Sequence, residues 1–344
     1  MDFNIIQMII DGAFLIGVAE KAPTLILLLV VVICIAMLSK GADWMIDGVV
    51  ELAHYTGLPR IVIGATIISL GTTTPEAVVS VMAAWMGNPG LALGNAVGSM
   101  IVNTGLIFGM TCLLATVPMN RFVLNRTGWV QDGAATLLVA LSVISFAVMA
   151  GKPVLNRWVG FLFLVLLAAY MYASYAWARR LGSRDVEKSD GHDLMAPGKI
   201  WSFIAGGLFL VALGARILVP FASEIAKRAG VPDDIIAATL VAFGTSLPEL
   251  MTAIAAVRKG HPEITVGNIV GANVLNCLFV IGASASASPL LIPNNFYYLH
   301  FPTMLFILFS FRFFVSTNKS GLFSRWQGAW LLGAYLVYLL LSFQ

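Results

Sequence analysis

The sequence predicts an all-α integral membrane protein of about ten transmembrane helices, arranged as two inverted five-helix repeats. Hydrophobic residues make up 59% of the 344 residues and charged residues only 11%, which is too apolar for a soluble domain. Apolar runs of roughly 20 residues, enough to cross about 30 Å of hydrocarbon, recur along the chain. A shift of 173 positions aligns residues 41–109 with 214–282 without a gap, with 22 identities in 69, which indicates an internal duplication.

The apolar runs place five spans in each half of the chain. The first half contains spans 24–46, 60–84, 91–116, 129–150 and 157–178. The second half contains spans 200–222, 233–256, 264–289, 296–315 and 326–343. The predicted organisation is therefore an N-terminal interfacial or extra helix (1–23), a first repeat (24–178), a polar linker (179–199) and a second repeat (200–344).

The odd number of spans in each half predicts that the second copy enters the membrane from the opposite side, so the repeats are inverted. Lys and Arg residues in the connecting segments test this, because they accumulate on the cytoplasmic side. With the spans above, 13 fall on the side of the linker and 5 on the other. We therefore expect a multi-pass protein of the cytoplasmic (inner) membrane with the 179–199 linker in the cytoplasm.

The repeated motifs GTTTPE (71–76) and GTSLPE (244–249) lie inside the second and seventh spans. Glycine frees the backbone, and proline suits the first position of a new half-helix because it has no amide hydrogen. We therefore expect helices 2 and 7 to be broken, which membranes tolerate only where protein or a polar cavity satisfies the backbone. The half-helices would end in partly negative carbonyls, around Ser69 and Ala242.

Each motif also places a carboxylate, Glu76 or Glu249, in an apolar segment whose spans hold no matching Lys or Arg. Inversion would bring both acids together near the middle of the membrane. Oxygen ligands of this kind suit hard cations such as Ca²⁺ and Na⁺. Because a buried, uncompensated carboxylate is costly, cations and protons should compete for the site. Further oxygens are available from Thr72, Thr73, Thr245, Ser246, Asn103 and Asn276.

Structural interpretations remain open for several of these residues. The hydroxyl residues could cap helices, and Asn103 and Asn276 could tie helices together. The glycine pairs spaced four apart, Gly94 with Gly98 and Gly267 with Gly271, favour close helix packing. Two further sets have simple interpretations, namely the acidic face Asp43, Asp47 and Glu51 as a solvated face, and Cys34, Cys112 and Cys277 as core thiols.

The paired motifs, GTTTPE with GNAVGSMIVN and GTSLPE with GNIVGANVLN, resemble the alpha-repeats of the calcium/cation antiporter superfamily, which contains the sodium/calcium exchangers. The resemblance implies one site that opens alternately to each side, while the first and sixth spans slide across the rest. It also implies a set of ion ligands, which are Ser69 (carbonyl), Thr72, Thr73, Glu76, Ser99, Asn103, Ala242 (carbonyl), Thr245, Ser246, Glu249 and Asn276.

Two positions depart from that family pattern. Ala272 stands where a serine commonly matches Ser99, and Asn276 stands where many sodium/calcium exchangers carry Asp. The site then holds two formal negative charges, which balance one Ca²⁺, and the counter-ion is left open between Na⁺ and H⁺.

The resulting hypothesis is a secondary active antiporter that exchanges Ca²⁺ for Na⁺ or H⁺, with inorganic cations and the lipid bilayer as partners and with no cofactor and no nucleic acid. The alternatives are a proton-coupled exchanger of Ca²⁺ or another divalent cation without sodium coupling, and a cation channel. An intramembrane enzyme is the weakest alternative, because no nucleophile or metal-ligand set accompanies the acids.

Overall fold

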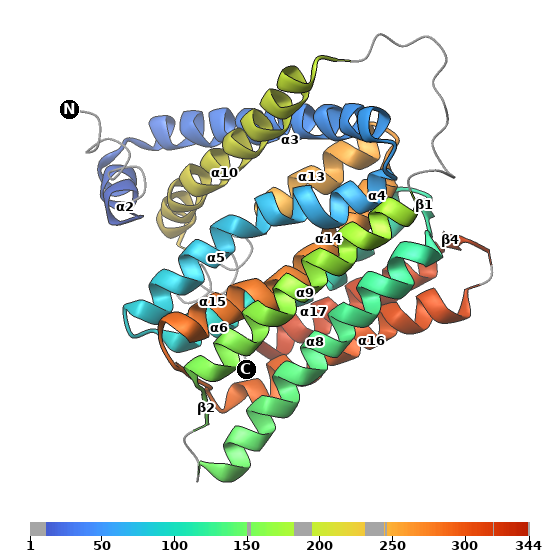
Figure 1. Ribbon diagram of the computed structural model, residues 1–344. Coiled ribbons are helices and arrows are strands. Elements are labelled where there is room, and N and C mark those ends of the chain that lie inside the picture. The colour runs from blue at the N-terminus through green and yellow to red at the C-terminus, as the bar shows by residue number, and fades with distance from the viewer. Residues whose placement is uncertain are drawn as a thin grey trace.

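The computed structural model describes residues 12–149, 153–181, 195–230, 244, 246–318 and 320–342, and this part of the chain is a packed set of helices (Figure 1). Within it, eight helices are long and apolar enough to cross a membrane. The predicted all-α membrane fold is therefore confirmed. The count of ten spans stays a prediction, because residues 231–243 and 245 lie outside the described residues.

The first half of the chain begins with α2 (Gly12–Lys21) and the long α3 (Thr24–Thr56). The second span is built from α4 (Arg60–Ile63), the π-helical segment η1 (Gly64–Ile68) and α5 (Ser69–Trp85). The third is built from α6 (Pro89–Ile101), the π-helical η2 (Val102–Phe108) and α7 (Gly109–Leu114). Two long helices, α8 (Arg121–Val148) and α9 (Arg157–Leu181), complete this half.

The second half repeats much of this order with α10 (Pro197–Arg228), α13 (Leu247–Arg258), α14 (Pro262–Leu275), the π-helical η4 (Asn276–Ile281), α15 (Gly282–Ala287), the π-helical η5 (Phe296–His300), α16 (Phe301–Thr317) and α17 (Arg325–Ser342). Two short antiparallel strand pairs join the halves. β1 (Val117–Pro118) pairs with β4 (Leu322–Phe323), and β2 (Val154–Leu155) pairs with β3 (Leu290–Leu291).

Most predicted spans match helices, but three helices are longer than predicted. The predicted 24–46 continues to Thr56, 200–222 continues to Arg228, and 129–150 starts at Arg121. Polar residues extend these helices because they find partners. Asp47 pairs with Lys259, and the Asn120 side chain caps α8 by accepting a hydrogen bond from the Val123 amide.

The ends of the first repeat and of the linker also differ from the predicted boundaries. α9 continues to Leu181 and α10 begins at Pro197, so the predicted linker 179–199 overlaps a helix at each end. Residues 182–194 lie outside the described residues, as do residues 1–11. The described part of the N-terminal segment, α2, has ten residues, which gives a length of about 15 Å. Whether the segment crosses the membrane stays a prediction.

The predicted break in helix 2 is wrong in its position and form. α5 runs through Gly71 and keeps Pro75 inside the helix, and the backbone irregularity is the π-helical η1 that precedes it. Neighbouring hydroxyl groups stabilise this turn. The Thr74 Oγ1 donates to the Leu70 carbonyl at 2.6 Å and the Thr72 Oγ1 donates to the Ser69 carbonyl at 3.4 Å.

The second copy of the motif behaves as predicted where it is described. α13 begins at Leu247, with Pro248 in its first two positions and Glu249 in its first turn. Proline suits this position because the first amides of a helix have no intrahelical acceptor. The two copies of one motif therefore adopt different backbones, one inside a continuous helix and one at a helix start.

The close helix packing expected at small residues is confirmed for one glycine pair. A Cβ on Gly267 or Gly271 would collide with the backbone of α4 and η1 at Ile61 or Ala65, so both glycines let α14 approach that backbone closely. The three cysteines are free and buried, in agreement with their prediction as core thiols. Nearly all of α14 is buried, which makes it the central helix of the described structure.

Candidate cation site

Two carboxylates from distant parts of the chain meet in the centre of the helix bundle. Glu76 of α5 and Glu249 of α13 are each fully buried, with 0% of their surface exposed, and they lie within electrostatic range of one another. None of their four carboxylate oxygens has a hydrogen-bond partner among the described residues. Such a pair is stable only when a cation or protons neutralise it.

The helices around the two acids pack in a crossed arrangement. α5 packs against η4, which begins at Asn276, and α13 packs against η2, which contains Asn103. Each acidic helix of one half therefore faces an asparagine-bearing π-helical segment of the other half. π-helical turns are frequent at functional sites. Here η2 and η4 contain Asn103 and Asn276, which are both fully buried.

Hydroxyl groups connect the two halves beside the acids. The Thr72 hydroxyl faces the Glu249 carboxylate, and its Oγ1 lies 3.4 Å from the Asn268 Oδ1. The Ser246 Oγ donates to the Ser99 Oγ at 3.5 Å. Each contact joins a residue of one half to a residue of the other, so the site is assembled from both repeats.

Unpartnered polar atoms mark the same region. The Thr73 Oγ1 and both polar side-chain atoms of Asn103 and Asn276 have no hydrogen-bond partner among the described residues, although all three residues are fully buried. Buried polar groups normally have partners. Carboxylate, hydroxyl and amide oxygens left free in one region are the donor set that hard cations such as Ca²⁺ and Na⁺ use.

Nine of the eleven predicted ligands are described, and all nine are buried. Thr72 lies against Glu249, Glu76 lies within electrostatic range of Glu249, and Ser246 contacts Ser99. The Ser69 carbonyl accepts from Thr72 rather than ending a half-helix. Ala242 and Thr245 lie outside the described residues, so their part in the site stays a prediction.

Asn95 and Asn268 belong to a Gly-Asn pair that recurs in the two repeats and are not among the predicted ligands. The Asn95 Nδ2 donates to the Ser80 Oγ at 2.9 Å and to the Glu76 carbonyl at 3.4 Å, and Asn268 contacts Thr72. Both asparagines support the helices that carry the acids or hydroxyls. The signal was available, because the pair recurs at the 173-residue spacing.

Charged groups gather at one end of the site helices. The Lys259 Nζ pairs with the Asp47 carboxylate and donates to the Asp43 carbonyl at 3.1 Å, which links the end of α13 to α3. Nearby, Glu263 contacts both Arg60 and His261 at 3.5 Å. Burial is the main cause that lowers the pKa of His261, and the Arg60 charge adds to it.

The fold and the site define a multi-pass membrane protein whose buried acids, hydroxyls and amides are suited to hold a cation. A family model described as sodium/calcium exchanger protein matches residues 26–176 and 199–344. The chain belongs to this family. Its members are exchangers, so the prediction of an ion-transporting antiporter rather than an enzyme is confirmed at this level.

Individual relatives span nearly the whole chain. The sodium/calcium exchanger MaX1 of Methanosarcina acetivorans is 27% identical, over 92% of this chain and 98% of its own length. The putative antiporter CaxA of Alkalimonas amylolytica is 29% identical, over 91% and 97%, and the inner membrane protein YrbG of Escherichia coli is 31% identical, over 87% and 91%. The solved structure of the sodium/calcium exchanger from Methanococcus jannaschii has the same fold, with a TM-score of 0.77 at 24% identity over 92% of this chain and 98% of that one.

Proposed function

We propose that this protein is a secondary active antiporter that exchanges Ca²⁺ for Na⁺ by alternating access at a site built from Glu76 and Glu249. One observation carries the proposal, which is the pair of fully buried carboxylates whose oxygens have no hydrogen-bond partner among the described residues. Leaving both ionised and uncompensated would cost several kcal/mol for each, as an order of magnitude. Two carboxylate charges balance one Ca²⁺.

Exchange follows from the same cost. A site emptied of compensating cations is too unfavourable to reorient, so the protein changes its open side only when Ca²⁺ or the counter-ions occupy the site. The name of MaX1, a sodium/calcium exchanger, supports Na⁺ as the counter-ion. Asn276 contributes no charge, so the proposed site carries two negative charges in each half-cycle.

Alternating access requires part of the protein to move past the site, and the packing supports α3 and α10 as that part. These two helices lie side by side on one face of the bundle (Figure 1), and they fit closely because Gly41 and Gly207 face one another. Against the site α10 presents larger side chains, with Leu208 on Gly71 and Val219 on Gly244. Contacts between a glycine and an aliphatic side chain contain no hydrogen bond or ion pair that would have to break, so they suit sliding of α3 and α10 together.

Proton coupling is the second candidate, and the buried acids favour it. Two facing carboxylates can bind protons in place of cations when no metal compensates them. The experiment therefore measures Ca²⁺ uptake into vesicles reconstituted with the purified protein, first under an outward Na⁺ gradient and then under an outward proton gradient. We expect uptake driven by Na⁺. Uptake driven only by protons would establish the second candidate.

Removal of either acid tests the site itself. Glu76→Gln and Glu249→Gln are expected to abolish driven Ca²⁺ uptake while the melting temperature in detergent is kept or raised, because each removes a buried charge. Glu20→Gln, at an exposed position of α2, is the matched control and should transport as the wild type does. Wild-type uptake by either glutamine variant would refute the site. Single-channel currents would refute the antiporter in favour of a channel.

We also propose that the protein lies in the cytoplasmic membrane with the 179–199 side in the cytoplasm, as the loop charges indicate. The charged groups around Lys259 would then form the cytoplasmic rim of the site.

A further inference from the structure

A chain of polar side chains leads outward from the two asparagines, and the mechanism above does not use it. Asn273 of α14 is fully buried, and its Nδ2 donates to the Thr104 Oγ1 at 2.7 Å and to the Gln131 Oε1 at 3.1 Å. Thr104 directly follows Asn103, and Asn273 precedes Asn276 by three positions, close to one helical turn. A single side-chain amide therefore bridges the segments that carry both asparagines.

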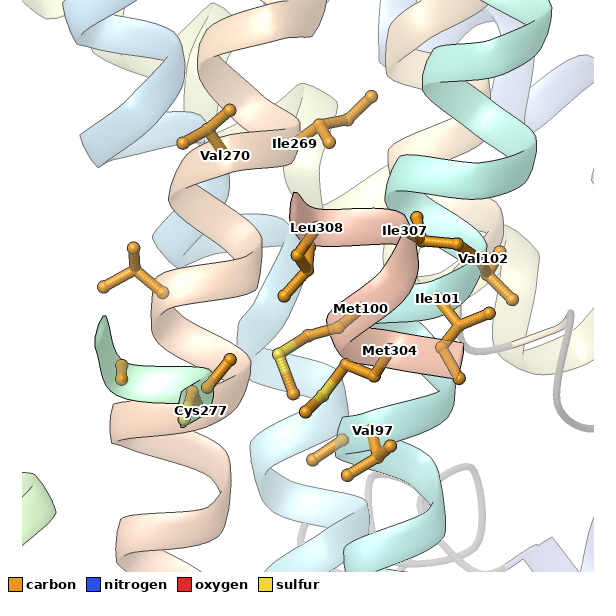
Figure 2. Close-up of a cluster of buried hydrophobic side chains, with 14 of the residues drawn as sticks. Val97, Met100, Ile101, Val102, Ile269, Val270, Cys277, Met304, Ile307 and Leu308 are labelled. Atoms are coloured by element: carbon orange, nitrogen blue, oxygen red, sulfur yellow. The ribbon is translucent and has the colours of Figure 1, made fainter. Parts of the chain in front are cut away.

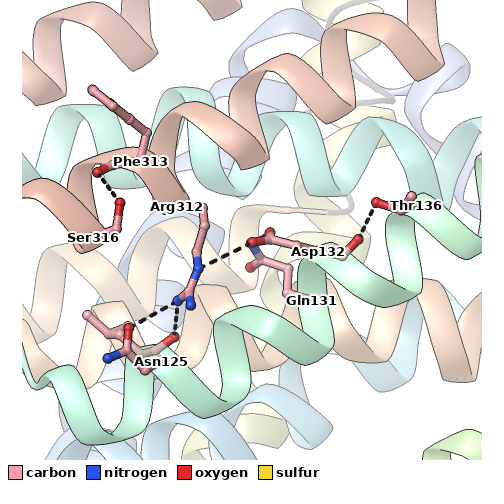
Figure 3. A network of polar contacts seen from close by, with 8 residues as sticks. Asn125, Gln131, Asp132, Thr136, Arg312, Phe313 and Ser316 are labelled. Carbon is pink, nitrogen blue, oxygen red and sulfur yellow. Dashed lines mark hydrogen bonds and ion pairs between the residues drawn. The ribbon is translucent and has the colours of Figure 1, made fainter.

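The outer end of this chain is anchored on α8 and α16. The Gln131 Nε2 donates to the Asp132 Oδ1 at 3.2 Å, and the Arg312 Nε lies 3.9 Å from the Asp132 Oδ2 (Figure 3). Arg312 also donates to the Asn125 Oδ1 at 3.2 Å and lies 4.2 Å from the centre of the Trp129 ring. Charge-assisted and stacked contacts of this kind hold an arginine in one orientation, so the position of Gln131 is fixed from outside.

The equivalent positions of the repeat form an apolar cluster. The 173-residue shift aligns Asn273 with Met100, Gln131 with Met304 and Thr104 with Cys277. These three are fully buried in the hydrophobic core, and Figure 2 shows Met100 and Met304 pointing toward one another. The fold can therefore fill this place with apolar side chains. A buried polar network costs more to bury than such a cluster, so its presence at one of the two equivalent places calls for a role other than packing.

The role concerns the orientation of the two site asparagines, Asn103 and Asn276. Neither polar side-chain atom of Asn103 or of Asn276 has a hydrogen-bond partner among the described residues, so no direct contact there sets the direction of either amide. Their direction must come from the backbone segments that carry them. Asn273 connects these two segments, because it bonds Thr104 of η2 and lies on α14, which continues directly into η4.

We propose that Asn273, held by Gln131, is a positioning residue for exchange, which fixes the geometry with which Asn103 and Asn276 meet the transported cation. This inference rests on the proposed function, because it takes the two asparagines as ligands. The Asn273 Nδ2 carries this role through its two hydrogen bonds, and the Asn273 Oδ1 has no hydrogen-bond partner among the described residues. Loss of such an outer support typically costs about 10- to 100-fold in metal affinity.

The experiment replaces the polar pair, Asn273 and Gln131, with methionines, as at the equivalent positions 100 and 304. Asn273→Met and Gln131→Met are made singly and together, and melting temperature, half-maximal Ca²⁺ concentration and maximal rate of uptake are measured in each. The single variants should melt at lower temperature, because each leaves a buried amide without its partner. The double variant should regain stability, because it recreates the apolar contact, yet its half-maximal Ca²⁺ concentration should stay raised by about ten-fold.

A purely packing role predicts the opposite for the double variant, namely recovery of both stability and wild-type Ca²⁺ dependence, and that result would overturn the inference. Thr104→Val, which removes one hydroxyl and keeps the shape, is a milder second test and should raise the half-maximal Ca²⁺ concentration with little loss of stability. An unchanged value there would equally overturn it. Met304→Leu is the matched control in the apolar cluster. Absence of uptake by the wild type refutes the proposed function, whereas wild-type uptake with unchanged variants refutes only this inference.

Discussion

The hydroxyl oxygens of Ser99 and Ser246 lie 3.5 Å apart and join the two halves of the chain beside the buried acids. The same shift of 173 positions pairs these serines with Ala272 and Thr73. Ala272 has no hydroxyl, and the Thr73 Oγ1 has no hydrogen-bond partner among the described residues. The two ends of the site therefore differ by one hydroxyl group, although they derive from one repeated unit.

Restoring that hydroxyl is expected to strengthen binding of the counter-ion. Ala272→Ser adds one neutral oxygen beside Thr73, and an added hydrogen bond contributes about 1 kcal/mol, which corresponds to about five-fold in a binding constant. The half-maximal Na⁺ concentration that drives Ca²⁺ uptake should fall by that factor. Ser99→Ala removes the matching oxygen and should raise it. Equal Na⁺ dependence of both variants and the wild type would contradict the prediction.

The contact between α3 and α10 predicts a sharp difference between two adjacent glycines. A Cβ on Gly207 would lie 2.5 Å from the Gly41 carbonyl oxygen and 2.7 Å from the Met45 amide nitrogen, and backbone atoms cannot move aside. Gly207→Ala should therefore destabilise the protein by about 1–3 kcal/mol, seen as a lower melting temperature, and should reduce exchange. Gly206→Ala is the matched control, because its Cβ would meet only Trp44 at 3.8 Å. Equal effects at the two positions would argue against a rigid α3 and α10 pair.

The ion pair between Lys259 and Asp47 links α13 to α3 and should slow their relative movement. Both side chains are partly exposed, at 27% and 43%, so the pair contributes at most about 1 kcal/mol. Lys259→Met is expected to speed exchange by up to about five-fold at low ionic strength. High salt should bring the wild type toward the variant, and the charge-reversed double variant Asp47→Lys with Lys259→Asp should return to the slower rate. A salt-independent difference would assign the effect to packing.

His261 should make stability depend on pH. Burial and the nearby Arg60 place its pKa in the folded protein below the ordinary value of about 6.5. Protonation therefore favours the unfolded state, and stability is lost as the pH falls from about 6.5 toward the lower folded pKa. His261→Gln should lose less stability than the wild type between pH 8 and about pH 5.5, as measured by melting in detergent. Identical pH profiles would show that His261 does not contribute.

Much of the fold and part of the site could be predicted from local patterns. Apolar runs locate most spans, because burial in lipid requires a continuous apolar stretch of fixed length. The repeated Glu76 and Glu249 indicate the chemistry, because an acid in such a stretch is costly unless it has a function. Helix ends were harder to predict. The spacing of Asp47 predicts a solvated face, but its partner Lys259 lies at the end of α13, far away in the sequence. A local pattern does not predict such a contact.

The backbone around Pro75 shows the same limit. Proline predicts a helix break, yet α5 continues through it, with the Leu208 side chain of α10 packed on Gly71. The same motif begins a helix at Leu247. The intrinsic helix propensity of the motif is weak, so the tertiary surroundings decide whether it continues a helix or begins one.

The sequence alone determined that this protein is a duplicated bundle of membrane helices with two intramembrane acids, because hydrophobic length, repetition and the cost of buried charge depend only on residue type and spacing. Only the tertiary structure decided which groups meet. It placed Thr72 against Glu249 and Ser246 against Ser99, and it built the Asn273 network at one place and a methionine cluster at the place that the repeat makes equivalent. Those contacts join residues far apart in the chain, and side-chain packing in three dimensions selects them.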